Sequence, residues 1–161
     1  MIREVFDHYD DTLDQTQEWE YDLVGNRTLQ KLDKGNDGFD TITSYSYDVN
    51  DRLLEEILDD LTAANKDRIT EYRYDHTQQT YKSVSENGVK LNETTFEYDA
   101  QGRMSIVTIT TFDENGTKTR IERTSYGYNT DGIRGSALHE IDSDADGVFE
   151  TSKLTEYLND S

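Results

Sequence analysis

The chain has 161 residues, and its hydrophobic fraction of 32% is low for a globular domain, so a thick two-layer core is not expected. It carries 16 Lys and Arg against 35 Asp and Glu, a net charge of −19, which argues against nucleic acid or anionic membrane surfaces as partners because both bind basic surfaces. The absence of Cys excludes disulfides and thiolate chemistry, the absence of Pro favours long strands, and no apolar run is long enough for membrane insertion as a helix.

A short motif recurs along the chain: two aromatic residues two positions apart, followed by Asp or Asn. Its copies are Trp19, Tyr21 and Asp22; Tyr45, Tyr47 and Asp48; Tyr72, Tyr74 and Asp75; Phe96, Tyr98 and Asp99; and Tyr126 and Tyr128 followed by Asn129. The second aromatic residues lie at 21, 47, 74, 98 and 128, so the copies are 26, 27, 24 and 30 residues apart. This period is typical of repeat architectures. We expect a single array over 1–161, with approximate units 1–26, 27–52, 53–79, 80–103, 104–134 and 135–161, belonging to a larger protein.

Each unit is predicted to contain two strands. In the strand before the second copy of the motif, Thr41, Thr43 and Tyr45 share one face, which is the period-2 pattern of a half-buried strand. The strands that follow the motifs are expected at 27–33, 52–59, 80–86, 103–113 and 136–142. Residues 53–58 have helical propensity, but their place in the repeat predicts a strand. The fold class is therefore all-β: long antiparallel hairpins in a curved or spiralling meander sheet.

Short turns are predicted directly after each motif. The acid of the motif can accept hydrogen bonds from backbone N–H groups two residues on, and a nearby Gly, Asn or Asp tolerates the left-handed conformation. The turn after Asp75 lacks the Gly. The aromatic pairs themselves are predicted to form a structural ladder between hairpins, in which truncating Tyr47 or Tyr74 to Ala would cost about 3–5 kcal/mol if the ring is buried. The alternative is that the rings stack on sugars.

The motif Tyr-x-Tyr-Asp, followed by x-x-Gly-x-Arg or Leu, resembles the RHS/YD (tyrosine–aspartate) repeat family. Residues 21–27, 45–53 and 96–103 carry the resemblance, which extends over essentially the whole chain. It implies a large β-sheet that spirals into a hollow shell. In bacterial polymorphic toxins and insecticidal toxin complexes such a shell encloses a toxic C-terminal domain, and in animal teneurins a similar shell belongs to an adhesion receptor. The acidic distal loops, the turn without Gly and the long period depart from the family pattern.

The acidic segment 142–150 is a candidate Ca²⁺ site. Asp142, Asp144, Asp146 and Glu150 occupy positions 1, 3, 5 and 9, and Gly147 occupies position 6. Ca²⁺ is bound by six to eight oxygen ligands, and D-x-D-x-D-G loops supply them. The segment is not an EF-hand, because position 12 is Lys153, and it resembles the nine-residue calcium loops of FG-GAP repeats. The alternative is a solvated acidic hairpin turn.

Two weaker relatives of this segment occur earlier in the chain. One contains Asp33, Asp37 and Asp40, and the other contains Asp7, Asp11 and Asp14. Both are expected at the distal tips of hairpins, so a row of cation sites along one rim would be consistent with the pattern.

No catalytic constellation is recognisable. His8, His76 and His139 are scattered over different units, and no phosphate loop or nucleophile motif is present. We therefore expect a non-catalytic structural segment of a secreted or cell-surface protein, with neighbouring repeats and an encapsulated toxin domain as partners. The alternative is an adhesion module that recognises a glycan or protein through its calcium loops and aromatic face. A hydrolase is disfavoured.

Overall fold

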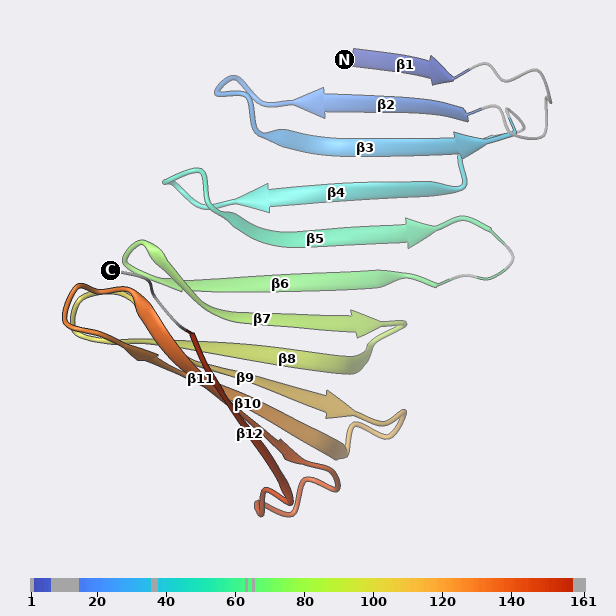
Figure 1. The fold of residues 1–161 in the computed structure, drawn as a ribbon. Coiled ribbons are helices and arrows are strands. Elements are labelled where there is room, and N and C mark those ends of the chain that lie inside the picture. Colours follow the sequence, from blue (N-terminus) through green and yellow to red (C-terminus); the bar gives the residue numbers. More distant parts are fainter. Residues whose placement is uncertain (1, 7–14, 36–37, 63, 65, 158–161) are drawn as a thin grey trace. The chain divides into compact units, whose positions relative to one another are not determined.

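The computed structural model describes residues 2–6, 15–35, 38–62, 64 and 66–157, and for residues 2–6 it describes only the backbone. These residues form twelve strands and no helix, which confirms the predicted all-β hairpin meander (Figure 1). Strands adjacent in the sequence are adjacent in the sheet, in the order β1 to β12. The strands are β1 (Ile2–Phe6), β2 (Gln15–Tyr21), β3 (Arg27–Lys34), β4 (Thr41–Tyr47), β5 (Leu53–Asp60), β6 (Arg68–Asp75), β7 (Gln78–Glu86), β8 (Val89–Tyr98), β9 (Met104–Phe112), β10 (Lys118–Tyr128), β11 (Arg134–Asp142) and β12 (Thr151–Glu156).

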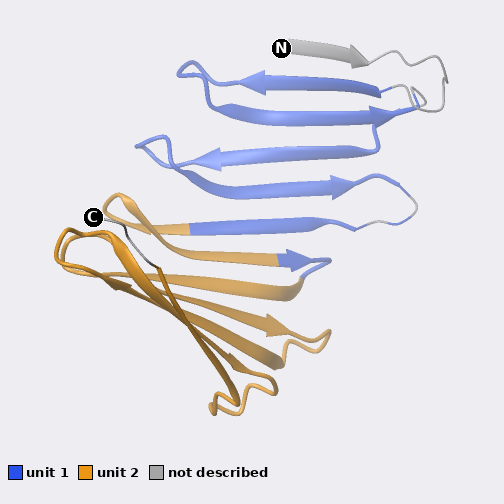
Figure 2. Ribbon diagram, in the orientation of Figure 1, with its two compact units in different colours: residues 1–72, 85–88 blue, residues 73–84, 89–161 orange. Residues whose placement is uncertain are grey.

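The chain divides into two compact units, coloured separately in Figure 2. Unit 1 comprises residues 1–72 and 85–88, and unit 2 comprises residues 73–84 and 89–161. Within unit 1, antiparallel pairing joins β1 successively to β2, β3, β4, β5 and the first half of β6. Within unit 2, the same pairing runs from β8 through β9, β10 and β11 to β12. The segment 53–58, whose helical propensity conflicts with its place in the repeat, is part of strand β5.

The sheet has almost no enclosed core. Among the described residues, Ala137 is the only buried hydrophobic side chain. The rings of Tyr47, Tyr98 and Tyr128 are only partly covered, and Tyr21 is 42% exposed. The ring of each of these tyrosines therefore contributes less by itself than the 3–5 kcal/mol expected for full burial.

A β-bulge recurs beside four of the turns that follow the aromatic motifs, which we call the proximal turns; the loops at the other ends of the strands are the distal loops. In four hairpins the register shifts just before the second aromatic residue of the motif, at Tyr21, Tyr47, Tyr98 and Tyr128. Each time, one residue of the following strand has no residue opposite it on the preceding strand: Thr28, Leu54, Ser105 and Gly135. A bulge of this kind bends the strand and strengthens its twist. The repeat is therefore structural as well as sequential.

The second aromatic residue fastens its hairpin to the one before. The hydroxyl groups of Tyr47, Tyr98 and Tyr128 donate hydrogen bonds to the backbone carbonyls of Arg27, Gln79 and Met104, at 2.8, 2.8 and 2.7 Å. The pairing of β3 with β4 ends at Leu29 and Ser44, two residues short of the Arg27 carbonyl. The pairing of β9 with β10 likewise ends at Ile106 and Ser125. The tyrosine hydroxyl thus satisfies a carbonyl beyond the end of the strand pairing.

In four of the motifs, the final Asp or Asn organises the turn that follows it. One oxygen of Asp48 accepts hydrogen bonds from the backbone N–H groups of Asn50 and Arg52, at 2.8 and 3.0 Å. Asp22, Asp99 and Asn129 accept the corresponding pair of bonds in their own turns. Asp51 has a φ of 59° where the other turns place Gly25, Gly102 and Gly132. In the turn after Asp75, which lacks Gly, His76 takes the left-handed conformation with a φ of 53°.

These turns predict a fall in stability at low pH. The hydrogen bond from the Arg52 side chain lowers the pKa of Asp48 below its ordinary 3.8, and the Arg103 backbone N–H does the same most strongly for Asp99. Because the folded pKa is depressed, the stabilisation is complete above the unfolded value and disappears as pH falls through the folded value. We expect the melting temperature to drop between about pH 5 and about pH 3, and thermal denaturation followed by circular dichroism measures the drop.

The control is Asp99→Asn, which keeps the acceptor oxygen, as Asn129 does naturally, but cannot titrate. Its melting temperature should fall less steeply over the same range. A wild-type chain that becomes steadily more stable down to pH 3 would mean that relief of its negative charge outweighs the loss of these bonds.

Candidate metal centre

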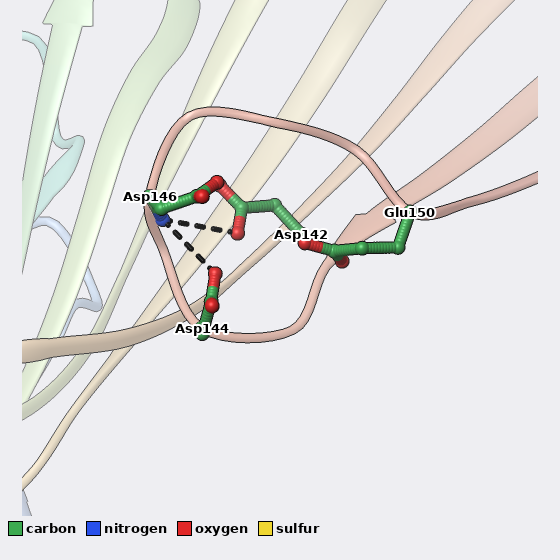
Figure 3. A group of neighbouring side chains, drawn as sticks. All are labelled: Asp142, Asp144, Asp146 and Glu150. Carbon is green, nitrogen blue, oxygen red and sulfur yellow. Dashed lines mark hydrogen bonds between the residues drawn. The ribbon is translucent and has the colours of Figure 1, made fainter.

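Four carboxylates converge in the loop between β11 and β12 (Figure 3). Asp142 is the last residue of β11, and Asp144, Asp146 and Glu150 follow it in the loop. Each residue offers one oxygen, and these four oxygens all lie within 4.8 Å of one another. Asp142 is fully buried, whereas the other three acids are exposed. The alternating spacing noted in the sequence thus places the acids side by side.

Backbone amides shape this loop around two of the acids. Asp142 accepts hydrogen bonds from the N–H groups of Asp146 and Gly147, at 3.2 and 2.9 Å. Glu150 accepts bonds from the backbone N–H and the hydroxyl of Ser143, at 2.8 and 3.0 Å. Asp142 therefore holds the tip of the loop, and Glu150 closes its two ends.

The two acids are ionised at neutral pH. Burial raises the pKa of Asp142, but the backbone N–H donors, that of Gly147 first, outweigh burial, so the pKa lies below its ordinary value. The backbone N–H of Ser143 is the main cause that lowers the pKa of Glu150. Charged carboxylates so close together repel one another, and a bound cation would remove that repulsion.

The donor set fits a hard divalent cation. All four groups are carboxylates, which suit Ca²⁺ or Mg²⁺ and not the softer metals that prefer thiolate or imidazole. Asp144 accepts one hydrogen bond from the backbone N–H of Asp146, at 3.3 Å. Asp146 accepts one from the backbone N–H of Val148, at 2.8 Å. Each carboxylate therefore keeps oxygen lone pairs that could coordinate an ion.

The second candidate cluster is only partly described. Asp37 lies outside the described residues, as do Asp7, Asp11 and Asp14 of the third. Asp40 accepts a bond from the backbone N–H of Lys34 at 2.6 Å. One oxygen of Asp33 is buried and has no hydrogen-bond partner among the described residues. Within the same part of the chain, neither acid belongs to a group of three ligands that could share an ion.

A loop-closing acid recurs in three distal loops, and the sequence did not reveal it. The bond from Lys34 to Asp40 has counterparts between the Asp60 N–H and Asp67, at 2.9 Å, and between Ser143 and Glu150. The closing acid follows its donor by six residues in the first loop and by seven in the other two. This spacing is a signal that could have been read, but in so acidic a chain it does not stand out. The acids at the ends of these loops thus have a structural role, closing the loop by a hydrogen bond, that does not depend on a metal.

Cations cover faces of the aromatic rings. The guanidinium carbons of Arg134, Arg103 and Arg27 lie 3.9, 4.4 and 5.6 Å from the ring centroids of Tyr126, Tyr128 and Tyr45. Such contacts stabilise the rings in place by about 0.5–1 kcal/mol at exposed sites. Because the guanidinium groups occupy one side of these rings, sugar stacking there is restricted.

Within the described residues, no helix has the length and apolar character needed to cross a membrane.

Comparison with known proteins identifies the fold. No protein-family model matches the chain, and no curated protein sequence matches it. A Tc holotoxin pore of Photorhabdus luminescens carrying a TccC3 mutation is similar over 89% of this chain, with 15% identity and a TM-score of 0.54. The crystal structure of TcdB2–TccC3–Cdc42 is similar over 89% of it, with 16% identity and a TM-score of 0.55. This chain spans only 8% and 9% of those two chains. Its fold is thus one found in Tc toxin components.

Proposed function

We propose that the chain is a non-catalytic structural segment of a secreted or cell-surface repeat protein, and that it forms part of a shell wall of the RHS/YD-repeat type. The repeated bond from a tyrosine hydroxyl to the carbonyl of the preceding hairpin carries this proposal, at Tyr47, Tyr98 and Tyr128. Each bond ties one hairpin to its predecessor, as a wall built from stacked hairpins requires. The likeness in fold to Tc toxin components supports the same function.

The partners of such a wall are the neighbouring repeats of its own protein and a toxin domain enclosed by the shell. Ca²⁺ bound by Asp142, Asp144, Asp146 and Glu150 would stabilise the loop that joins β11 to β12. The adhesion alternative, in which the aromatic face meets a glycan, has less support because arginines lie over Tyr45, Tyr126 and Tyr128.

Deleting a whole repeat tests the wall proposal. Asn26 and Arg52 hold equivalent turn positions, because the backbone N–H of each donates to the motif acid four residues earlier. Removing residues 27–52 therefore joins two turns in phase, and every remaining hairpin keeps its direction. We expect this variant to retain its β-sheet circular dichroism and cooperative melting, with reduced stability.

The control is a shorter deletion that removes one strand of the unit instead of two. Deleting residues 27–40 takes out β3 and its loop, so the proximal and distal turns exchange ends of the sheet. We expect this shorter deletion to abolish cooperative melting. If the whole-unit deletion unfolds the chain while the half-unit deletion leaves it folded, the chain is not a repeat array.

A further inference from the structure

A groove with a mixed polar and apolar lining lies on one face of unit 1. It consists of two hollows of about 410 and 380 Å³. Both hollows are lined by Thr41, Leu58 and Arg68, so they form one continuous depression. The wider lining also includes Tyr45 of the second aromatic motif and Asp40 of the second acidic cluster.

The strand register explains why the face is hollowed here. Thr43 of β4 lies opposite Gln30 of β3 and Leu58 of β5, and Leu58 lies opposite Arg68 of β6. The four side chains therefore form one row across four strands, on the same face of the sheet. Because Thr43 is shorter than its neighbours in the row, it forms a low floor between higher walls. Thr41, two residues away on the same strand, extends that floor toward the distal loops.

The lining combines hydrogen-bonding groups of balanced charge with a comparable amount of apolar surface. Tyr45 and Glu56 lie opposite each other at one end, and Lys34 and Lys66 line the other end. Counting the acids Asp40, Glu56 and Asp60 against the bases Lys34, Lys66 and Arg68 gives three of each. This balance differs sharply from the whole chain, whose net charge is −19.

We propose that this groove binds a neutral linear oligosaccharide. Guanidinium groups donate hydrogen bonds to sugar hydroxyls, and carboxylates accept hydrogen bonds from them. Amide and hydroxyl side chains can do both. The distance along β4 from Tyr45 to Thr41 is about 14 Å, at a rise of about 3.4 Å per residue, and the hollow continues to the loops beyond. An extended ligand lying along the strands would therefore fit. The side chain of Leu58, beside the Thr43 floor, supplies an apolar wall against which a sugar ring can pack.

Other ligand classes fit less well. A peptide that adds a strand needs a free sheet edge, whereas this groove lies on the face of paired strands. A peptide anchored by side chains needs deep apolar pockets, and only Leu32 and Leu58 are aliphatic here. A polyanion would meet the carboxylates of the lining and the field of a strongly acidic chain. A polycation would meet the three basic side chains.

The test uses the full chain on an array of neutral tetrasaccharides built from glucose, mannose, galactose or N-acetylglucosamine, together with counterparts that carry a uronic or sialic acid. Isothermal titration then measures the strongest binder. We expect a neutral tetrasaccharide to bind in preference to its acidic counterparts. Glu56→Gln and Thr43→Tyr should each weaken that binding by about tenfold or more, by removing a charged hydrogen bond and by filling the floor.

The controls lie one residue along on the same strands and point to the opposite face. Glu55→Gln and Ser44→Tyr should leave the affinity unchanged, and circular dichroism should show all four variants folded. Glu56→Gln, which adds no volume, decides the question if Thr43→Tyr does not fold. The proposal is overturned by no binding of any neutral tetrasaccharide, by a preference for the acidic ones, or by equal affinities of Glu56→Gln and Glu55→Gln.

Discussion

We expect the replacement of Tyr128 with Ala to lower the free energy of unfolding by about 3 kcal/mol, a loss that urea denaturation would measure. The substitution removes three contributions: the partly buried ring, the cation–π contact with Arg103 and the hydrogen bond to the Met104 carbonyl. A fully buried Phe or Trp would cost 3–5 kcal/mol, so a half-covered ring together with its cation–π contact contributes about 2 kcal/mol, and the hydrogen bond adds about 1 kcal/mol.

Two further variants separate these contributions. Tyr128→Phe keeps the ring and loses only the hydroxyl, so we expect a loss of about 1 kcal/mol. Tyr21→Ala truncates the equivalent ring of the first motif, which is 42% exposed, and should cost about half as much as Tyr128→Ala. A loss below about half a kcal/mol for Tyr128→Ala would mean that the tyrosine ladder does not hold the hairpins together.

If the acidic loop binds Ca²⁺ as proposed, we expect added Ca²⁺ to raise the melting temperature of the chain above its value in EDTA. A ligand at 100 times its Kd that binds only the folded state stabilises it by about 2.7 kcal/mol. In a chain of this size that stabilisation corresponds to roughly 5–10 °C. Differential scanning calorimetry with increasing Ca²⁺ measures the shift, and equal ionic strength from NaCl separates specific binding from general screening of the negative charge.

The matched variants change only exposed acids, two in the acidic loop and one in a different turn. Asp144→Asn combined with Asp146→Asn preserves the buried Asp142 and the loop-closing Glu150, yet should abolish the Ca²⁺ shift. Asp131→Asn, in the exposed turn after β10, should leave it intact. An unchanged melting temperature in the wild-type chain between EDTA and millimolar Ca²⁺ would show that the carboxylate–amide bonds of the loop are sufficient without a metal.

The hairpin pattern was predictable because it depends on local sequence. Alternation around Tyr45 predicts a strand, and an Asp that can bond to the next backbone amides predicts the turn after it. The same rules predicted β5, where place in the repeat overrode the helical propensity of residues 53–58. Non-local bonds were not predictable in this way. The bond from Tyr128 to the Met104 carbonyl requires knowing where the strand pairing stops, which no local pattern states.

In the acidic loop, too, only the features that depend on local sequence were predictable. The spacing of Asp142, Asp144 and Asp146 predicted that their side chains would converge, and they do. It did not predict that Asp142 would be fully buried, because burial depends on how the loop folds back onto β11. The groove was also invisible in the sequence, since it arises from side chains on four strands that only the register brings into one row.

The near absence of buried hydrophobic side chains, with Ala137 the only one among the described residues, affects how the protein responds to temperature. Exposure of apolar surface is the source of the large positive heat-capacity change of unfolding, usually about 12–15 cal/mol/K per residue. A chain that hides so little apolar surface releases less of it on melting, so its heat-capacity change per residue lies below that range. Its free energy of unfolding therefore curves only weakly with temperature. Cooling destabilises this sheet less than it destabilises a protein with a large buried hydrophobic core.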